Sequence, residues 1–371
     1  MDFVDSSTVN GRPFEEKINE WLSQTLKSSL TYPASTRTGR MVGSEMADQC
    51  VRKNQFRLNH TDRGEITGTP VISMESGKAV EELIKRNLLL NNPDSVLLWD
   101  SWIPKTKKMG LDYAGKLDLL LQFEDIPILV DIKTTSRIGE EKRVNIKDVE
   151  RLLNEEDFLE KLNKTKGGIR KSPLKMDAYI TQVMGYLTMT DLEYGAVFVF
   201  SRASENFYDD VTVDCEIVRA TDKDKYNIIA RMLLASRLND SYQLAEKPST
   251  YKKTTTCKYC DFTKFCYGGE DPGMQKLTKE ESVAAYKNIY AEAVELYEQN
   301  RGTLAWIRDK KIEETAALKA VIANPSQENV QILLENYEMP VDEILFNVQT
   351  YYRKTDREQY QLPVNIIGRP K

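Results

Sequence analysis

The chain has 371 residues, and 52 Lys and Arg stand against 57 Asp and Glu, which gives a formal net charge of −5. Its hydrophobic fraction of 40% and charged fraction of 29% are typical of a globular protein and exclude a collagen-like, fibrous or wholly disordered chain. At this coarse level, a mildly acidic chain also argues against a nucleic-acid partner. The sequence shows no secretion signal and no apolar run as long as a membrane span, so we expect a cytoplasmic protein with no membrane partner.

The predicted elements begin with helices. Apolar residues at helical spacing predict an amphipathic helix at 14–28, and Ser44 is the expected N-cap of a second helix that carries Cys50. A third helix is predicted over 76–90. After it, the pattern changes to short extended segments.

The middle of the chain predicts an α/β core. Residues 114–123 and 127–133 have the pattern of two strands joined by a short turn, and the second is apolar on both faces until its end, as in a central strand. A helix at 177–189 then leads to further strands at 195–200 and about 210–219. This order of elements predicts a mixed sheet flanked by helices.

The C-terminal part of the chain changes character. Thr278 and Glu281 form a capping box, and helical segments follow it to about residue 350. We therefore divide the chain into an α/β domain over 1–270 and a C-terminal all-helical region with a tail over 271–371.

Three charged residues on the predicted strands form a candidate site. Asp131 and Lys133 are two residues apart, so their side chains project from one face of a strand. Asp118 lies on the neighbouring strand, where a hairpin could bring its carboxylate beside that of Asp131. Two such carboxylates repel each other, and a divalent cation between them relieves the repulsion. Oxygen ligands favour Mg²⁺ or Mn²⁺. On its own, however, Asp-x-Lys is also the pattern of a surface ion pair.

Two flanking patterns complete a series. Gly77 precedes Glu81 on the predicted third helix, and Gln182 and Tyr186 share one face of the helix at 177–189. The series Gly-x3-Glu, Gly-x2-Asp, Asp-x-Lys and Gln-x3-Tyr resembles that of the PD-(D/E)XK nuclease superfamily, particularly its RecB-like branch. The resemblance implies a restriction-endonuclease-like mixed-sheet core.

By position, the resemblance assigns seven site residues, which are Glu81, Asp118, Asp131, Ile132, Lys133, Gln182 and Tyr186. The two aspartates would bind the cation, with the isoleucine carbonyl beside them. The glutamate stands where many RecB-like relatives have histidine, but other branches have glutamate there, so it is a further expected ligand. The lysine would be the catalytic lysine, and the glutamine and tyrosine would position the substrate and the site.

Three of the five cysteines are clustered with a metal-binding spacing. Cys257, Cys260 and Cys266 leave a fourth ligand wanting, and Cys50 is the best candidate. By spacing alone, zinc and an iron–sulfur cluster remain equally open. The stretch from Ser44 through Cys50 resembles the Ser-x5-Cys-x-Arg that opens iron–sulfur nucleases of the AddB and CRISPR-adaptation type. This resemblance covers about 40–270 and implies a [4Fe–4S] cluster that staples the N-terminal helix to the end of the core.

The resemblance implies a Mg²⁺- or Mn²⁺-dependent deoxyribonuclease. The first expectation is an exonuclease that hydrolyses single-stranded or end-bearing DNA with a metal-activated water. The chain contains no P-loop, so any helicase, recombinase or replication partner is a separate polypeptide. The alternative is a catalytically silent DNA-binding or assembly subunit that keeps the nuclease fold. The complete set of carboxylates and lysine argues against that alternative.

A charged insertion over 137–176 departs from the family pattern. Its part at 161–175 has six Lys and Arg and no Asp or Glu. The insertion is either a solvated helix and loop or a guide for the DNA strand. Because such a basic stretch coexists with acidic segments, the net charge of −5 does not exclude DNA.

Overall fold

The structure is a computed structural model of the chain. It describes residues 8–9, 12–13, 31–32, 41–42, 50–59, 66–67, 69–103, 113–135, 176–201, 213–246, 260, 262, 266, 273–324 and 326–351. The predicted helix at 14–28, the predicted helix start at Ser44, Cys257 and nearly all of the insertion lie outside these residues.

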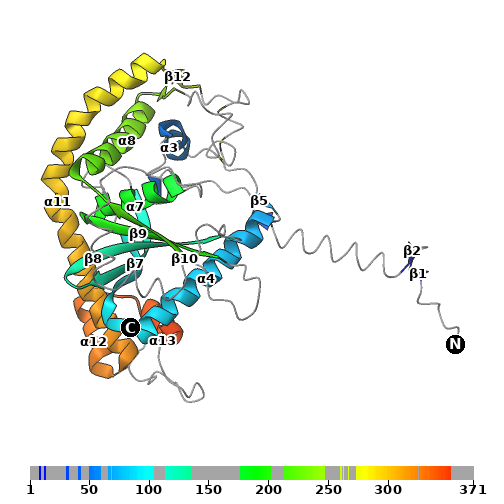
Figure 1. Cartoon of the computed structure of the whole chain (residues 1–371), viewed down its shortest axis with the longest axis vertical. Helices are drawn as coiled ribbons and strands as arrows, with labels where there is room; N and C mark the ends of the chain where they lie inside the picture. The colour runs from blue at the N-terminus through cyan, green and yellow to red at the C-terminus, as the bar shows by residue number, and fades with distance from the viewer. Residues whose placement is uncertain are drawn as a thin grey trace, which may run out of the picture.

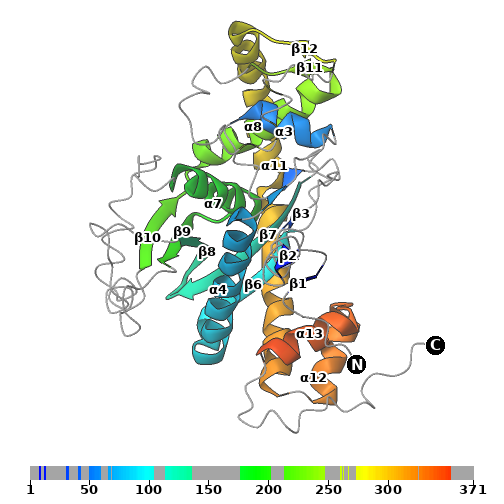
Figure 2. The same ribbon diagram turned by 90° about the vertical axis from the view of Figure 1, so that its right-hand side faces the viewer.

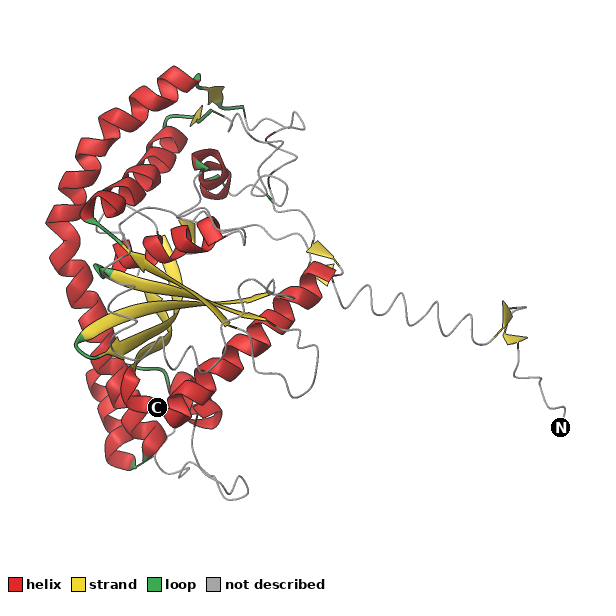
Figure 3. Cartoon of the chain, viewed as in Figure 1, coloured by secondary structure: helices red, strands yellow, loops and turns green. Residues whose placement is uncertain are grey.

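A mixed sheet occupies the centre of the molecule, between helices (Figure 3). Its main strands are β6 (Val96–Ile103), β7 (Tyr113–Phe123), β8 (Ile126–Thr135), β9 (Tyr194–Ser201) and β10 (Val213–Arg219). They follow the order β10-β9-β8-β7-β6, and β8 and β9 are parallel while the other neighbours are antiparallel. The short β4 (Met41–Val42) pairs in parallel with the first residues of β7. The predicted mixed α/β core is therefore confirmed.

Among the described residues, the helices of at least eight residues are α3 (Val51–Leu58), α4 (Thr69–Asn91), α7 (Met176–Thr190), α8 (Asp222–Asp240), α11 (Lys279–Ala323), α12 (Gln327–Asn336) and α13 (Val341–Tyr351). The minor elements are the 3-10 helix η1 (Pro93–Ser95) and the two-residue strands β1 (Thr8–Val9), β2 (Arg12–Pro13), β3 (Thr31–Tyr32), β5 (Ile66–Thr67), β11 (Gln243–Leu244) and β12 (Gln275–Lys276). Among the described helices, none has the length and apolar character that a membrane crossing requires.

The two faces of the sheet build two apolar cores. Alternate side chains of a strand project to opposite faces, so Ile128 and Val130 of β8 pack in one core while Leu129 between them packs in the other. Leu89 of α4 belongs to the first core and Val183 of α7 to the second. Helices α4 and α7 thus cover opposite faces of the sheet.

The 45-residue helix α11 runs the length of the molecule (Figures 1 and 2), with α3 and α8 near one end and α12 and α13 near the other. It begins with the predicted capping box, in which Thr278 and Glu281 exchange side-chain and backbone hydrogen bonds. Its Tyr297 and Leu304 belong to the core that contains α7, and its Leu318 belongs to the core that contains α4. One helix therefore completes both cores.

Candidate active site

Asp118 and Asp131 lie where β7 and β8 stop pairing. The last pair of the ladder between the two strands is Leu119 with Val130, so pairing stops one residue short of Asp118 on β7 and of Asp131 on β8. Beyond that point β7 continues beside β6, and β8 continues beside β9. The backbone N–H of Ile132 donates to Oδ2 of Asp118 at 2.9 Å. A carboxylate thus takes up a backbone donor at the opening between the strands.

Asp131 is almost fully enclosed, with a relative exposure of 1%. Lys133 Nζ and Gln182 Nε2 donate to its Oδ1 at 2.9 and 3.1 Å. Gln182 Nε2 also lies 3.5 Å from the hydroxyl oxygen of Tyr186, and this hydroxyl donates to the backbone carbonyl of Lys116 at 2.9 Å. The structure therefore brings Asp131 together with the predicted lysine, glutamine and tyrosine.

The second carboxylate oxygen of Asp131 differs from the first. Oδ2 is buried and accepts no hydrogen bond from the described residues. Lys133 Nζ lies 2.8 Å from it, but with an orientation that provides no hydrogen bond. The charge of Oδ2 is thus offset by the nearby ammonium, while its lone pairs remain available to a further donor or cation.

Lys85 is a member of the site that the sequence analysis did not identify. Its side chain is fully buried. Its ammonium donates to Oδ1 of Asp100 at 2.6 Å and to Oε1 of Glu81, and it lies 4.0 Å from Oδ1 of Asp118. The sequence contained a signal for this residue, because a glutamate and a lysine four positions apart share one helical face.

Asp100 is the second residue that the sequence analysis missed. It lies on β6 between the paired positions Trp99↔Leu119 and Ser101↔Leu117, so it stands opposite Asp118. Its φ is 46°, which is the left-handed region and unusual inside a strand. The available signal was a single carboxylate in an apolar strand.

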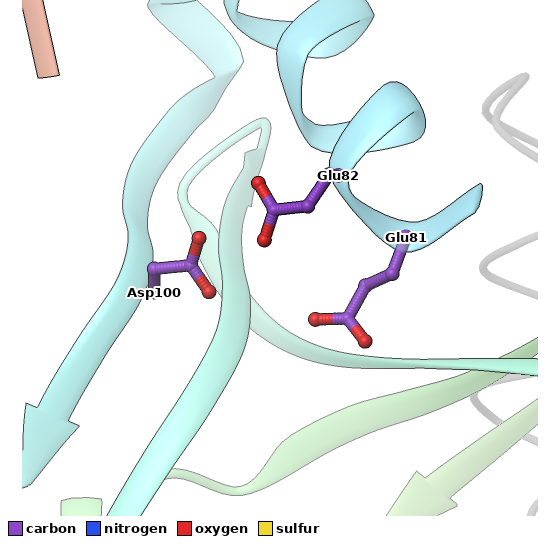
Figure 4. Close-up of side chains that lie close together, drawn as sticks. All are labelled: Glu81, Glu82 and Asp100. Carbon is purple, nitrogen blue, oxygen red and sulfur yellow. The ribbon is translucent and has the colours of Figure 1, made fainter. Parts of the chain in front are cut away.

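Glu81, Glu82 and Asp100 each offer a carboxylate oxygen within 4.8 Å of the others. Figure 4 shows the two glutamates extending from α4 towards Asp100 on β6. Glu82 is exposed, whereas the other two contact the ammonium of Lys85. The described part of the site thus contains more carboxylates than cations.

Burial and this excess of negative charge raise the pKa values of the acids. Burial, followed by repulsion from Asp131, raises the pKa of Asp118 from 3.8 to about 6. Burial raises the pKa of Asp131, and burial together with Asp118 raises that of Glu81. Burial alone would lower the pKa values of Lys85 and Lys133, but the surrounding carboxylates outweigh it and raise both.

The donor set fits a hard divalent cation. The half-buried carboxylate of Asp118 and the buried Oδ2 of Asp131 provide carboxylate oxygens, the ligand type that Mg²⁺ and Mn²⁺ prefer. Glu81 lies close enough to raise the pKa of Asp131 by its charge. In the described arrangement, however, Glu81 is hydrogen-bonded to Lys85.

The described cysteines of the predicted cluster are Cys50, at the start of α3, and Cys260 and Cys266. Cys50 is the N-cap residue of α3. Arg52 Nη1 donates to the sulfur of Cys266 at 3.9 Å, and the rings of Phe56 and Phe262 have centroids 5.7 Å apart. The start of α3 and the segment that carries Cys260 and Cys266 therefore lie side by side.

Two buried side chains join α3 to the end of the α/β region. Arg52 Nε donates to the carbonyl of Ala245 at 2.6 Å. Gln55 donates to the carbonyl of Gln243 at 2.6 Å and accepts from the N–H of Ala245 at 2.9 Å. These contacts fix the helix that follows Cys50 against β11.

The sequence matches no family model and no curated protein. Among solved structures, the chain is similar to SSO0001 with a TM-score of 0.33 and 13% identity, over 68% of this chain and 93% of that one. It is also similar to an alkaline exonuclease from Laribacter hongkongensis, with a TM-score of 0.34 and 13% identity, over 60% of this chain and 93% of the exonuclease. With such low scores, the function must be judged from the site itself.

Proposed function

We propose that the protein is a nuclease of the PD-(D/E)XK type that depends on Mg²⁺ or Mn²⁺. The observation that carries this proposal is the pairing of the buried Asp131 with the half-buried Asp118 at the opening between β7 and β8, with Lys133 and Gln182 on Asp131. The Lys133 ammonium lies within 2.9 Å of both oxygens of Asp131, and the carboxylates of Asp118 and Glu81 add further negative charge beside it. A phosphodiester-cleaving centre has a use for this excess of carboxylates, because it has to hold a cation.

The residues would divide the work as follows. Asp118 and Asp131 would hold the cation, with Glu81 and the carbonyl of Ile132 as further ligands. A bound Mg²⁺ or Mn²⁺ would supply Lewis acidity and lower the pKa of a water molecule. The Lys133 ammonium, 2.8 Å from a ligand oxygen, would stabilise negative charge on the phosphate.

Gln182 and Tyr186 would keep Asp131 in its orientation. Gln182 donates to Asp131 and lies beside the Tyr186 hydroxyl, which is tied to the backbone of β7. Orientation of a ligand by a hydrogen-bonded second residue is a common requirement of metal centres.

The substrate we propose is single-stranded or end-bearing DNA, cleaved as an exonuclease. This choice rests on the motif resemblance, and a separate helicase, recombinase or replication protein would be a suitable partner. The insertion over 137–176, with its six cations at 161–175, would contribute to the DNA path.

We further propose a [4Fe–4S] cluster on Cys50, Cys257, Cys260 and Cys266. The supporting observation is the presence of two buried positive charges near the described cysteines. Arg52 and Arg57 are buried at 3% and 1% exposure, one beside the sulfur of Cys266 and the other 5.7 Å from the Phe262 ring. Buried guanidinium groups are suitable neighbours for an anionic metal–thiolate centre. Anaerobic purification followed by iron, sulfide and zinc analysis tests this proposal, and stoichiometric zinc without iron would contradict it.

The nuclease assignment is tested with Asp131→Asn, a nearly isosteric change that removes the charge. End-labelled single-stranded DNA, linear duplex and closed circular DNA are incubated with the wild type in Mg²⁺, Mn²⁺ or EDTA. We expect cleavage of the linear substrates with metal, none in EDTA, and loss of cleavage in the variant. Asp309→Asn, at an exposed position on α11, is the matched control and should cleave like the wild type.

The catalytically silent alternative predicts a different outcome. In that case the wild type binds DNA but leaves all three substrates intact with either metal. Cleavage that persists in Asp131→Asn would also refute the assignment.

A further inference from the structure

Lys85 holds a full charge inside the protein. Its side chain has no solvent exposure, whereas lysine is almost never fully buried without partners. Three carboxylates surround its ammonium, and they come from three elements, Glu81 on α4, Asp100 on β6 and Asp118 on β7. Only the last of these lies on the hairpin that carries the two aspartates of the proposed metal centre.

We propose that Lys85 is a positioning residue of that centre, whose ammonium serves as a permanent counter-cation and holds Glu81, Asp100 and Asp118 together when no divalent cation is bound. This inference rests on the proposed function, because it concerns the cation that Asp118 and Asp131 would bind. It adds a role for two residues, Lys85 and Asp100, that the motif series does not contain.

The backbone supports this role. Asp100 adopts a left-handed φ of 46° within a strand, a conformation that is retained only when the surroundings impose it. Its carboxylate contacts Lys85 at 2.6 Å and Lys116 at 2.8 Å. Gly77, about two turns before Lys85 on α4, lies so close to β8 that an added Cβ would be 2.9 Å from Oγ1 of Thr134. The lysine is therefore carried on a helix that is fixed against the site.

The ammonium has two opposite effects on the centre. Without a divalent cation, it offsets the repulsion among the carboxylates and stabilises the fold. When a divalent cation arrives, the same charge, 4.0 Å from Asp118, repels it and weakens its binding. Removing Lys85 should therefore destabilise the metal-free protein and strengthen metal binding.

The first test is Lys85→Met, which keeps most of the side-chain volume and removes the charge. Thermal unfolding is measured in EDTA and over a Mn²⁺ titration without DNA. We expect a lower melting temperature in EDTA and a half-saturating Mn²⁺ concentration at least about fivefold below that of the wild type. A lysine that only fills space would leave the half-saturating concentration unchanged.

Lys225→Met is the matched control. Lys225 is also buried and also paired with an aspartate, Asp191, at 2.9 Å, but it has no contact with the site carboxylates among the described residues. We expect this variant to melt at a lower temperature in EDTA and to keep the wild-type half-saturating Mn²⁺ concentration within about twofold.

A second variant, Asp100→Asn, tests the same role in the opposite direction. Asparagine tolerates the left-handed conformation, so the backbone of β6 is kept. One negative charge is lost while Lys85 remains, so we expect the half-saturating Mn²⁺ concentration to rise at least about threefold. If Lys85→Met is folded only with Mn²⁺ present, that dependence supports the proposal, and Asp100→Asn still decides it.

The inference is overturned if Lys85→Met leaves the half-saturating concentration unchanged or raises it, or if Asp100→Asn lowers it. Failure of the proposed function looks different, because then Mn²⁺ would not shift the melting temperature of the wild type at all. If Mn²⁺ stabilises the wild type and Asp131→Asn abolishes that effect, the metal centre stands, and the Lys85 variants test the inference alone.

Discussion

Among the described residues, two clusters combine a buried lysine with aspartate, and their charge balance is opposite. In the cluster at Asp191, one carboxylate accepts from Lys225 at 2.9 Å and from the hydroxyl of Tyr297, and Arg301 lies 3.7 Å away. In the candidate site, by contrast, the single ammonium of Lys85 contacts three carboxylates, of which Asp100 also contacts the exposed Lys116.

The carboxyl pKa values respond in opposite directions. Burial would raise the pKa of Asp191, but the hydrogen bonds from Tyr297 and Lys225 outweigh it and lower that pKa. In the candidate site, burial and like charges raise the pKa values of Asp118, Asp131 and Glu81. The same residue types therefore form a charge-balanced cluster around Asp191 and a cluster with an excess of negative charge in the candidate site.

The largest expected difference between the two clusters concerns catalysis. Lys133→Met should reduce DNA cleavage at least about hundredfold, because the ammonium that would stabilise charge on the phosphate is removed. Lys225→Met should retain the wild-type rate per folded molecule, since that lysine pairs with Asp191 and does not belong to the candidate site. Initial rates on end-labelled DNA, normalised to the folded fraction from circular dichroism, check this comparison. Equal losses of cleavage rate in the two variants would contradict the expected difference between the clusters.

The next effect is on stability. Asp191→Asn should lower the free energy of unfolding by about 3 kcal/mol at neutral pH, because it leaves the buried Lys225 without its charged partner. Urea denaturation measures this loss. Asparagine is tolerated at the positive φ of 49° of this position, so backbone strain does not contribute. If the free energy of unfolding falls no more than in an exposed control such as Asp309→Asn, the ion pair of Asp191 does not stabilise the fold.

A smaller effect of opposite sign is expected at Asp118. In EDTA at pH 7.5, Asp118→Asn should raise the free energy of unfolding by about 2 kcal/mol, because the wild-type carboxylate must ionise in a place that disfavours its charge. The asparagine oxygen can still accept from the N–H of Ile132. The same urea experiment is suitable, and a destabilised variant in EDTA would contradict the charge excess that we describe.

The smallest effects are the pH dependences of these differences. The pKa of Asp118 is raised to about 6 from 3.8, so the advantage of Asp118→Asn should be absent below the lower value, grow between the two, and be complete above about pH 6. The pKa of Asp191 is lowered, so the stability lost in Asp191→Asn is fully present above the unfolded value and vanishes as the pH falls through the folded one. Melting curves from pH 3 to 8 should therefore show two variants whose differences from wild type have opposite signs.

The sequence predicted the part of the site that lies on regular elements. Asp131 and Lys133 alternate along one strand, and Gln182 and Tyr186 share a helical face, so local periodicity was sufficient to place each pair together. The proximity of Asp118 to this group required only a hairpin.

The remainder of the site depends on features that have no local signature. Asp100 lies in a strand that the periodicity indicated only vaguely, and its left-handed φ cannot be read from the residue type. The role of Lys85 depends on the carboxylates of Asp100 and Asp118, which are 15 and 33 positions away in the sequence and are brought beside it by the packing of α4. The capping box at Thr278 and the helical segments that follow it to about residue 350 were predicted and confirmed, but the reach of α11 across both cores followed from tertiary packing.

Helix α11 has a consequence for how the protein is made. At about 1.5 Å per residue it extends for about 68 Å, and its buried residues from Ala293 to Val321 close cores that begin near residue 51. During synthesis, α4 and α7 are available to cover the two faces of the sheet early, but the parts of both cores that α11 closes stay open until the helix has been made as far as Val321. Until then, the apolar side chains that α11 covers are exposed on the nascent chain. This stage of translation is therefore the one at which chaperones would find apolar surface to bind.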